Sequence, residues 1–188
     1  MSLVFVDSVG LLALWNDDDQ WHGGAKGAFI PISDGRTTLV TTSFILAECG
    51  NAASRTPFRA EANRLRLEFE AAKTLIWPNE VDWRQAWNAY QRGEADQAGI
   101  VDHISFVVMK RLGIARAFTN DRHFRAAGFE ACSEADENEK LTQRRIKAHK
   151  IAATGLSVNQ QDSADSKDTN CRLTPSARHL CSLSAHPI

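Results

Sequence analysis

The chain has 188 residues, a hydrophobic content of 43% and a formal net charge of −1. This composition allows one ordinary globular domain with an appendage, and it excludes a global positive field that would attract nucleic acid. Its four cysteines form no C-x-x-C pair, which argues against a disulfide framework or a zinc site and suits a reducing cytoplasm. No signal peptide or apolar run of membrane-spanning length is visible, so we expect a cytoplasmic protein without a membrane partner.

In chain order, short apolar or β-branched runs alternate with segments of helical spacing. Five runs are typical of buried strands: LVFVD (3–7), TTLVTT (37–42), TLIWP (74–78), IARAFTN (114–120) and FEACS (129–133). Helical spacing is found in residues 8–16, 43–54, 58–73, 81–92, 101–113 and 121–127, and residues 25–35 form a further short segment ending in a turn. This alternation predicts an α/β fold, a parallel β-sheet of four to five strands flanked by helices on both faces.

The last part of the chain differs in composition from the rest. No Phe, Tyr or Trp follows Phe129, and the segment SVNQQDSADSKDTN is strongly polar. Such a sequence buries too little surface to offset the entropy of ordering it. We therefore expect a folded domain over residues 1–132 and a poorly ordered C-terminal extension over 133–188, with a basic helix at 141–153.

Four acidic residues stand out because their neighbours are apolar. Asp7 ends the first strand, Asp121 follows the fourth, and Glu48 and Asp102 lie on helices that pack close to the sheet. Each aspartate has a structural alternative, because an Asp before a helix is usually an N-cap. Glu48 has no such explanation, since a carboxylate among apolar residues needs a partner and no basic residue stands three or four positions away.

If the four acids converge, their mutual repulsion requires a cation. The carboxyl ends of parallel strands form one edge of a sheet, where ligand sites of α/β proteins lie. A cluster of carboxylate oxygens selects a hard divalent ion, Mg²⁺ or Mn²⁺, over zinc. Such a site suits the hydrolysis of a phosphodiester bond.

The same residues carry a resemblance to a known family. FVDSVGLLAL, TTSFILAECGN, IVDHISFVVMKRLG and AFTNDRHFRAAGF, in this order and spacing, resemble the PIN-domain nucleases, and among them the VapC-type toxins of bacterial toxin–antitoxin pairs. The resemblance spans about residues 3–130. It implies a Mg²⁺- or Mn²⁺-dependent endoribonuclease that cuts RNA, is inhibited by a cognate antitoxin protein and forms a homodimer.

Site residues follow from the resemblance position by position. Asp7, Glu48, Asp102 and Asp121 would be the catalytic metal ligands. Thr119 would orient an aspartate through its hydroxyl, and Ser8 would do the same beside Asp7.

Several other residues allow two interpretations each. Asp96 matches an extra acid of some relatives or is a solvated loop residue, and His103 contacts substrate or lies beside the site. Four arginines, Arg55, Arg59, Arg64 and Arg66, either grip phosphates or form a solvated helix face. Trp83, Trp87 and Tyr90 share a helical stripe that is more typical of a core or dimer interface than of base stacking.

Two other functions were weighed against the nuclease. A phosphatase of the haloacid dehalogenase type requires a second aspartate two residues after the first, and this position is Val9. A catalytically degenerate PIN-like module that binds RNA or a protein remains the alternative function. The RNA target and the number of metal ions are not encoded in any recognisable pattern.

Overall fold

A computed structural model describes residues 2–132 of the chain. Its strands form one sheet in the order β3-β2-β1-β4-β5, and every neighbouring pair is parallel. The strands are β1 (Ser2–Val6), β2 (Thr37–Thr42), β3 (Leu75–Ile76), β4 (Arg116–Phe118) and β5 (Glu130–Ala131). The predicted parallel α/β fold is therefore confirmed, with five strands.

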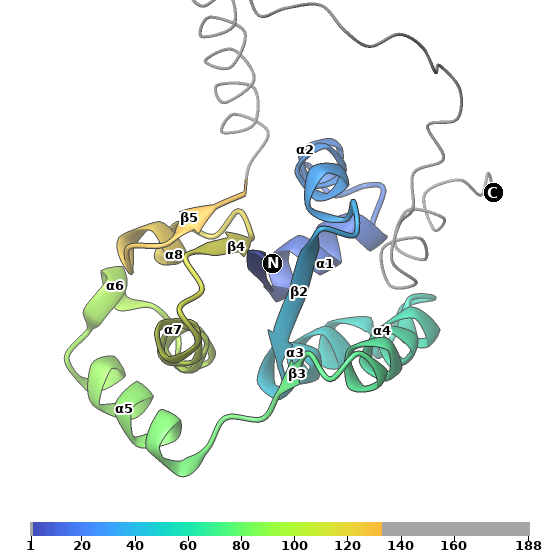
Figure 1. Cartoon of the computed structure of the whole chain (residues 1–188). Coiled ribbons are helices and arrows are strands. Elements are labelled where there is room, and N and C mark those ends of the chain that lie inside the picture. Colours follow the sequence, from blue (N-terminus) through green and yellow to red (C-terminus); the bar gives the residue numbers. More distant parts are fainter. Residues whose placement is uncertain (1, 133–188) are drawn as a thin grey trace, which may run out of the picture.

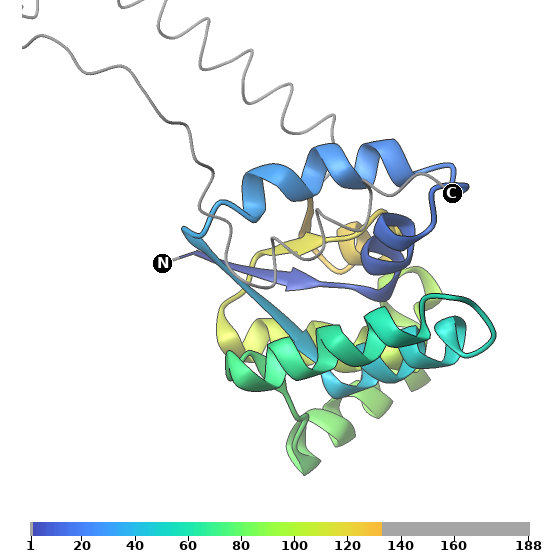
Figure 2. The ribbon, with the colours of Figure 1, turned by 90° about the vertical axis from the view of Figure 1, so that its right-hand side faces the viewer.

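Helices cover both faces of this sheet. They are α1 (Ser8–Trp15), α2 (His22–Phe29), the 3₁₀ turn η1 (Ile30–Ile32), α3 (Ser43–Ala53), α4 (Arg59–Ala71), α5 (Glu80–Gln91), α6 (Glu94–Gln97), α7 (Ile100–Leu112) and α8 (Arg122–Ala126). Figure 1 labels these elements, and Figure 2 shows α2 on one face with α3, α4 and α5 on the other. Helix α5 is the outermost, because it packs on α7 rather than on the sheet.

Strand β1 lies at the centre of the sheet and determines where the chain's acids meet. Val4, Phe5 and Val6 are completely buried, as expected of a strand covered on both faces. Val6 pairs with Phe118 of β4, so the residues that follow β1 and β4 emerge side by side at the carboxyl edge. This adjacency joins segments more than 110 residues apart in sequence.

A glycine allows the first helix to approach this edge closely. A Cβ atom on Gly10 of α1 would lie 2.6 Å from both the carbonyl oxygen and a ring carbon of Phe118. No real Cβ tolerates such a contact, so only glycine lets α1 pass this close to β4. The start of α1, with Asp7 and Ser8, is thereby held against the end of β4.

Two segments differ from the sequence-based prediction. Residues 25–35, predicted as a short segment with a turn, belong largely to α2 and η1. The short element α6 was not predicted, because it is a turn of left-handed backbone in which Ala95, Asp96 and Gln97 have φ values of 54°, 58° and 60°. Side chains other than glycine rarely adopt this conformation, so helical periodicity gives no sign of it.

The predicted extension over 133–188 and its helix at 141–153 lie outside the described residues. None of the helices between residues 2 and 132 has both the length and the hydrophobicity needed to cross a bilayer.

Candidate metal centre

Asp7 does not act as a side-chain cap. It occupies the N-cap position of α1 with an extended backbone, yet its carboxylate makes no capping hydrogen bond. The side chain is 2% exposed and accepts a hydrogen bond of 2.6 Å from the hydroxyl of Thr119. Side-chain capping, the alternative interpretation of Asp7, therefore does not account for this buried carboxylate.

Burial and neighbouring acids perturb this carboxyl group. Burial raises the pKa of Asp7 to about 7, against the lowering effect of the Thr119 hydrogen bond. The negative charges of Asp102 and Asp121 raise it further. The carboxyl group of Asp7 therefore lies close enough to both other aspartates to respond to their charges.

Thr119 connects two of the acids. Its hydroxyl donates to Asp7 and accepts a hydrogen bond of 3.0 Å from the backbone N–H of Asp121. The threonine is completely buried at the end of β4, so its rotamer is held by the surrounding core. Its expected position against an aspartate is present in the structure.

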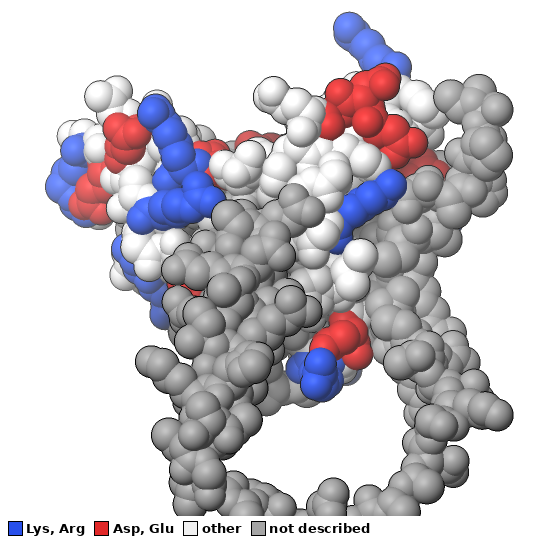
Figure 3. Space-filling model, turned by 90° about the horizontal axis from the view of Figure 1, so that it is seen from above, with Lys and Arg blue, Asp and Glu red and all other residues white. Residues whose placement is uncertain are grey.

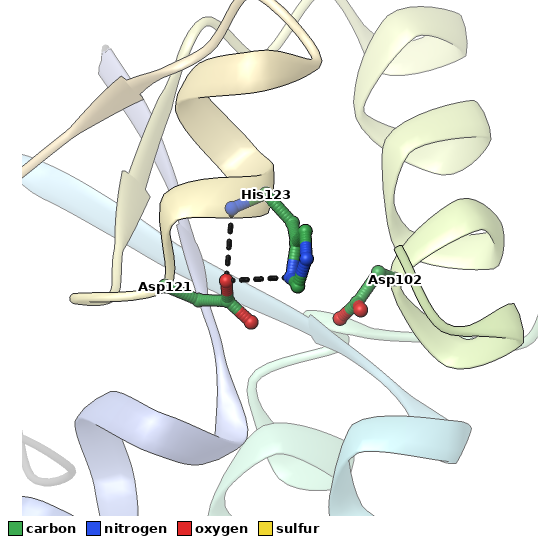
Figure 4. A group of neighbouring side chains, drawn as sticks. All are labelled: Asp102, Asp121 and His123. Carbon is green, nitrogen blue, oxygen red and sulfur yellow. Dashed lines mark hydrogen bonds and ion pairs between the residues drawn. The ribbon is translucent and has the colours of Figure 1, made fainter. Parts of the chain in front are cut away.

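Asp121 does cap α8, and this role leaves it in the cluster. One carboxylate oxygen accepts a hydrogen bond of 2.8 Å from the backbone N–H of His123, as a helix N-cap does. The same oxygen lies 2.9 Å from Nδ1 of His123 (Figure 4). Capping and clustering are compatible, because the cap fixes the carboxylate at the carboxyl end of β4.

Asp102 approaches the same point from α7. It stands in the first turn of the helix and accepts a hydrogen bond of 3.0 Å from the backbone N–H of Gly99. Burial raises the pKa of Asp102 to about 6, and the charges of Asp121 and Glu48 contribute to the rise. Figure 4 shows its carboxylate directed toward Asp121 and His123.

Glu48 finds its partner in Ser8. The hydroxyl of Ser8 donates to a carboxylate oxygen of Glu48 at 2.9 Å, joining α1 to α3. Ser8 was expected to orient Asp7, and its side chain instead contacts Glu48. The reason is geometric: the helical turn that begins at Ser8 directs its hydroxyl toward α3, which packs against α1. The hydroxyl of Ser8 is the hydrogen-bond partner that Glu48 lacks among its neighbours in sequence.

Sequence reasoning missed one candidate ligand, His123. Asp102, Asp121 and His123 each offer one ligand atom within 4.8 Å of the others, a spacing suited to a metal ion. The only sequence signal for His123 was its place two residues after Asp121, in the first turn of a short helix. That position becomes informative only when α7 is known to face α8.

The donor set fits a divalent cation. Asp102 and Asp121 lie within ligand distance of each other and of His123, whereas Asp7 and Glu48 are outside this group of ligand atoms. Burial, and after it the charges of neighbouring acids, raises the pKa values of Asp7 and Asp102. Bound cations relieve such repulsion, and carboxylate oxygens are the ligands that hard ions prefer. His123 adds an imidazole at the side of Asp121.

Asp96 and His103 lie at the margin of this cluster. Asp96 is in the left-handed turn and forms an ion pair of 3.3 Å with Arg122, with both side chains more than half exposed. His103 is buried, with its ring against those of Tyr90 and Phe106, and burial lowers its pKa. Neither belongs to the group of ligand atoms found among the described residues.

Two of the four predicted arginines line a cavity that none of the four acids lines. Arg59 and Arg66 line a cavity of about 410 Å³ between α3 and α4, together with Leu46, Leu75 and Trp77. Arg66 is also engaged by Glu70 and Asn63 of its own helix.

Comparison with known proteins agrees with this arrangement. The PIN domain matches residues 4–130, which is most of the chain. The chain belongs to the PIN-domain family. The 23S rRNA-specific endonuclease VapC20 of Mycobacterium tuberculosis, from strains CDC 1551 / Oshkosh and H37Rv, is 30% identical over 135 residues, covering 68% of this chain and 95% of the relative.

A solved structure leads to the same relationship. The crystal structure of Mycobacterium tuberculosis VapC20, described as a sarcin–ricin loop cleaving toxin, matches with a TM-score of 0.60 and 26% identity. The match covers 70% of this PIN-domain chain and 99% of that structure. The resemblance to VapC-type toxin nucleases is thereby confirmed, whereas the role of each site residue is a matter for proposal.

Proposed function

We propose that this PIN-domain protein is a divalent-metal-dependent endoribonuclease that hydrolyses RNA phosphodiester bonds and acts as the toxin of a toxin–antitoxin pair. The observation that carries the proposal is that Asp102, Asp121 and His123 present ligand atoms within 4.8 Å of one another, with Asp7 and Glu48 near enough for their charges to act on this cluster. The kinship with VapC20, itself named as an RNA endonuclease, supports the reaction class.

The four carboxylates would hold Mg²⁺ or Mn²⁺, with His123 as a further ligand beside Asp121. When bound, the ion supplies a Lewis acid that activates water and neutralises charge on the scissile phosphate. The protein's own residues would orient the acidic ligands. Thr119 holds Asp7, Ser8 holds Glu48, and Gly99 holds Asp102, so the ligands are preorganised by hydrogen bonds before substrate arrives.

An RNA-cleavage assay with the full chain tests this function. We expect cutting with Mg²⁺ or Mn²⁺, none with EDTA, and loss of cleavage in Asp7→Asn, Asp102→Asn and Asp121→Asn. Asp34→Asn, at a half-buried acid paired with Arg36 in the turn before β2, is the matched control and should retain activity. Equal cutting in EDTA, or in all three cluster variants, would refute the metal mechanism.

The substrate named for the relatives gives a first RNA to test. A sarcin–ricin loop oligonucleotide and 23S ribosomal RNA belong in the assay because VapC20 is named for them. RNA binding without cutting by the wild-type chain would instead favour the degenerate binding module.

We further propose an antitoxin partner, a homodimer and a cytoplasmic location. The relation to VapC toxins supports the first two. The two described cysteines, Cys49 and Cys132, are buried free thiols, which suits a reducing compartment.

A further inference from the structure

His123 brings a nitrogen atom to a site whose other ligand atoms are carboxylate oxygens. Asp102, Asp121 and His123 are each half-buried, and each offers one ligand atom within 4.8 Å of the others. In Figure 4 the imidazole ring of His123 lies between the carboxylates of Asp102 and Asp121. The three side chains are therefore partly shielded from water but still open to an ion that arrives from solvent.

The ring nitrogen nearest to Asp121 makes no hydrogen bond. Nδ1 of His123 is buried and lacks a hydrogen-bond partner, although a carboxylate oxygen of Asp121 lies 2.9 Å away. That oxygen instead accepts a hydrogen bond from the backbone N–H of His123. A buried nitrogen without a partner costs free energy unless a bound group satisfies it. Nδ1 is thus available to bind an ion.

The separation of Nδ1 from this oxygen matches that of two neighbouring ligands on one ion. In an octahedral site with bonds of about 2.1 Å, adjacent ligand atoms lie about 3 Å apart. The observed distance is 2.9 Å. The adjacent cation, Arg122, does not take the place of an ion, because it is mostly exposed and pairs with Asp96 at 3.3 Å.

A nitrogen ligand changes which ion such a site prefers. Mg²⁺ takes oxygen ligands and gives up its water reluctantly, whereas imidazole nitrogen suits the divalent ions of the first transition row. Mn²⁺ is the member of that row that also favours carboxylate oxygens. A centre with two carboxylates and one imidazole therefore combines the ligands that distinguish Mn²⁺ from Mg²⁺.

We propose that His123 binds the metal ion through Nδ1 and makes the centre select Mn²⁺ over Mg²⁺. The inference rests on the proposed nuclease function and deepens it, because it names the ion that the site takes and the residue that chooses it. The competing role for His123 is to position Asp121 without touching the ion. Loss of a positioning residue weakens both ions alike, whereas loss of a nitrogen ligand weakens Mn²⁺ selectively.

Ion binding to the full chain is measured without RNA, by the electron paramagnetic resonance signal of free Mn²⁺ and by competition with Mg²⁺. His123→Asn should weaken Mn²⁺ binding at least about tenfold, the lower end of the loss for groups that support a metal ligand, and Mg²⁺ binding less than about twofold. His123→Asp replaces the nitrogen by a carboxylate oxygen, so it should keep the site and abolish the preference for Mn²⁺. His22→Asn is the matched control, since the imidazole of His22 contacts Ala13 and Asp17 instead.

A spectroscopic arm tests the ligand directly in the wild-type protein. Electron spin-echo envelope modulation of bound Mn²⁺ should show coupling to a nitrogen nucleus, and His123→Asn should lose this coupling while His22→Asn retains it. Circular dichroism confirms that each variant is folded; if His123→Asn is not, the wild-type spectrum and His123→Asp decide. A wild-type spectrum without nitrogen coupling overturns the inference, as does an equal loss of Mn²⁺ and Mg²⁺ binding in His123→Asn.

Failure of the nuclease proposal is read separately. Wild-type protein that binds Mn²⁺ with nitrogen coupling but cuts no RNA would leave the role of His123 standing and remove the activity. Wild-type protein that cuts RNA but binds the two ions with equal affinity would keep the nuclease and overturn the selectivity.

Discussion

At the scale of single residues, hydrogen bonds to uncharged donors arrange the acids. Asp7, Glu48 and Asp102 accept from Thr119, Ser8 and the backbone of Gly99, which are all uncharged donors. Neutral donors orient a carboxylate without neutralising it, so the negative charge stays available to a cation. A salt bridge in the same place would compete with metal binding.

Thr119→Val tests this arrangement. The valine has nearly the same shape but cannot donate to Asp7, so the pKa of Asp7 should rise further and protons should compete better with the metal. We expect the Mn²⁺ concentration for half-maximal cleavage to increase roughly tenfold, the lower bound for loss of a group that orients a ligand. Thr119→Ser keeps the hydroxyl and should stay near wild type. An unchanged Mn²⁺ requirement in Thr119→Val would contradict the role assigned to this bond.

At the scale of elements, the site depends on how closely α1, α7 and α8 approach the ends of β1 and β4. Gly10 permits the contact of α1 with Phe118, and Gly113 ends α7 with a left-handed residue that lets β4 begin. The left-handed turn α6 then brings the start of α7 beside α8. Backbone strain of this type is found where surrounding structure imposes it, often near functional sites.

Gly10→Ala should separate α1 from β4. Because the new Cβ would lie 2.6 Å from a backbone oxygen that cannot move freely, we expect a loss of about 1–3 kcal/mol in the free energy of unfolding. Urea titration followed by circular dichroism measures this. Gly23→Ala is the control: its Cβ meets nothing within 4 Å, and alanine favours helix by up to about 1 kcal/mol. A Gly10→Ala variant as stable as Gly23→Ala would show that the close approach is not required.

At the scale of the whole molecule, positive and negative charges nearly balance. Cationic and acidic side chains are interspersed on the described part of the face in Figure 3, in keeping with the net charge of −1. Long-range attraction for RNA is accordingly weak, so the proposed substrate would be recognised through local features such as the candidate metal centre.

The stability of the whole domain should depend on pH through Asp7. Its pKa is raised from 3.8 to about 7 in the folded state, so folding takes up a proton between these values. Stability is therefore lost as the pH rises from about 4 to about 7, and about 3 kcal/mol of this loss falls between pH 5 and pH 8.

Thermal unfolding in EDTA at pH 5 and pH 8 measures this effect. We expect the midpoint to be lower at pH 8, Mn²⁺ to raise it more at pH 8 than at pH 5, and Asp7→Asn to flatten the profile. A wild-type midpoint that is higher at pH 8 in EDTA would contradict the raised pKa of Asp7.

Local patterns in the sequence predicted the alternation of strands and helices, the parallel sheet and four candidate acids. These features are local, since strand and helix periodicities are written in neighbouring residues and an acid in an apolar context is visible without a structure. The family resemblance also rests on short segments in order along the chain.

Which side chains from distant segments contact one another is visible only in the tertiary structure. The strand order places β1 beside β4, and this adjacency, not any spacing in the chain, brings Thr119 to Asp7 across 112 positions. The partner of Ser8, the inclusion of His123 and the exposure of the α5 aromatics follow from how helices pack on that sheet. Packing between distant segments is not encoded in local periodicity, so these contacts could not be predicted from sequence alone.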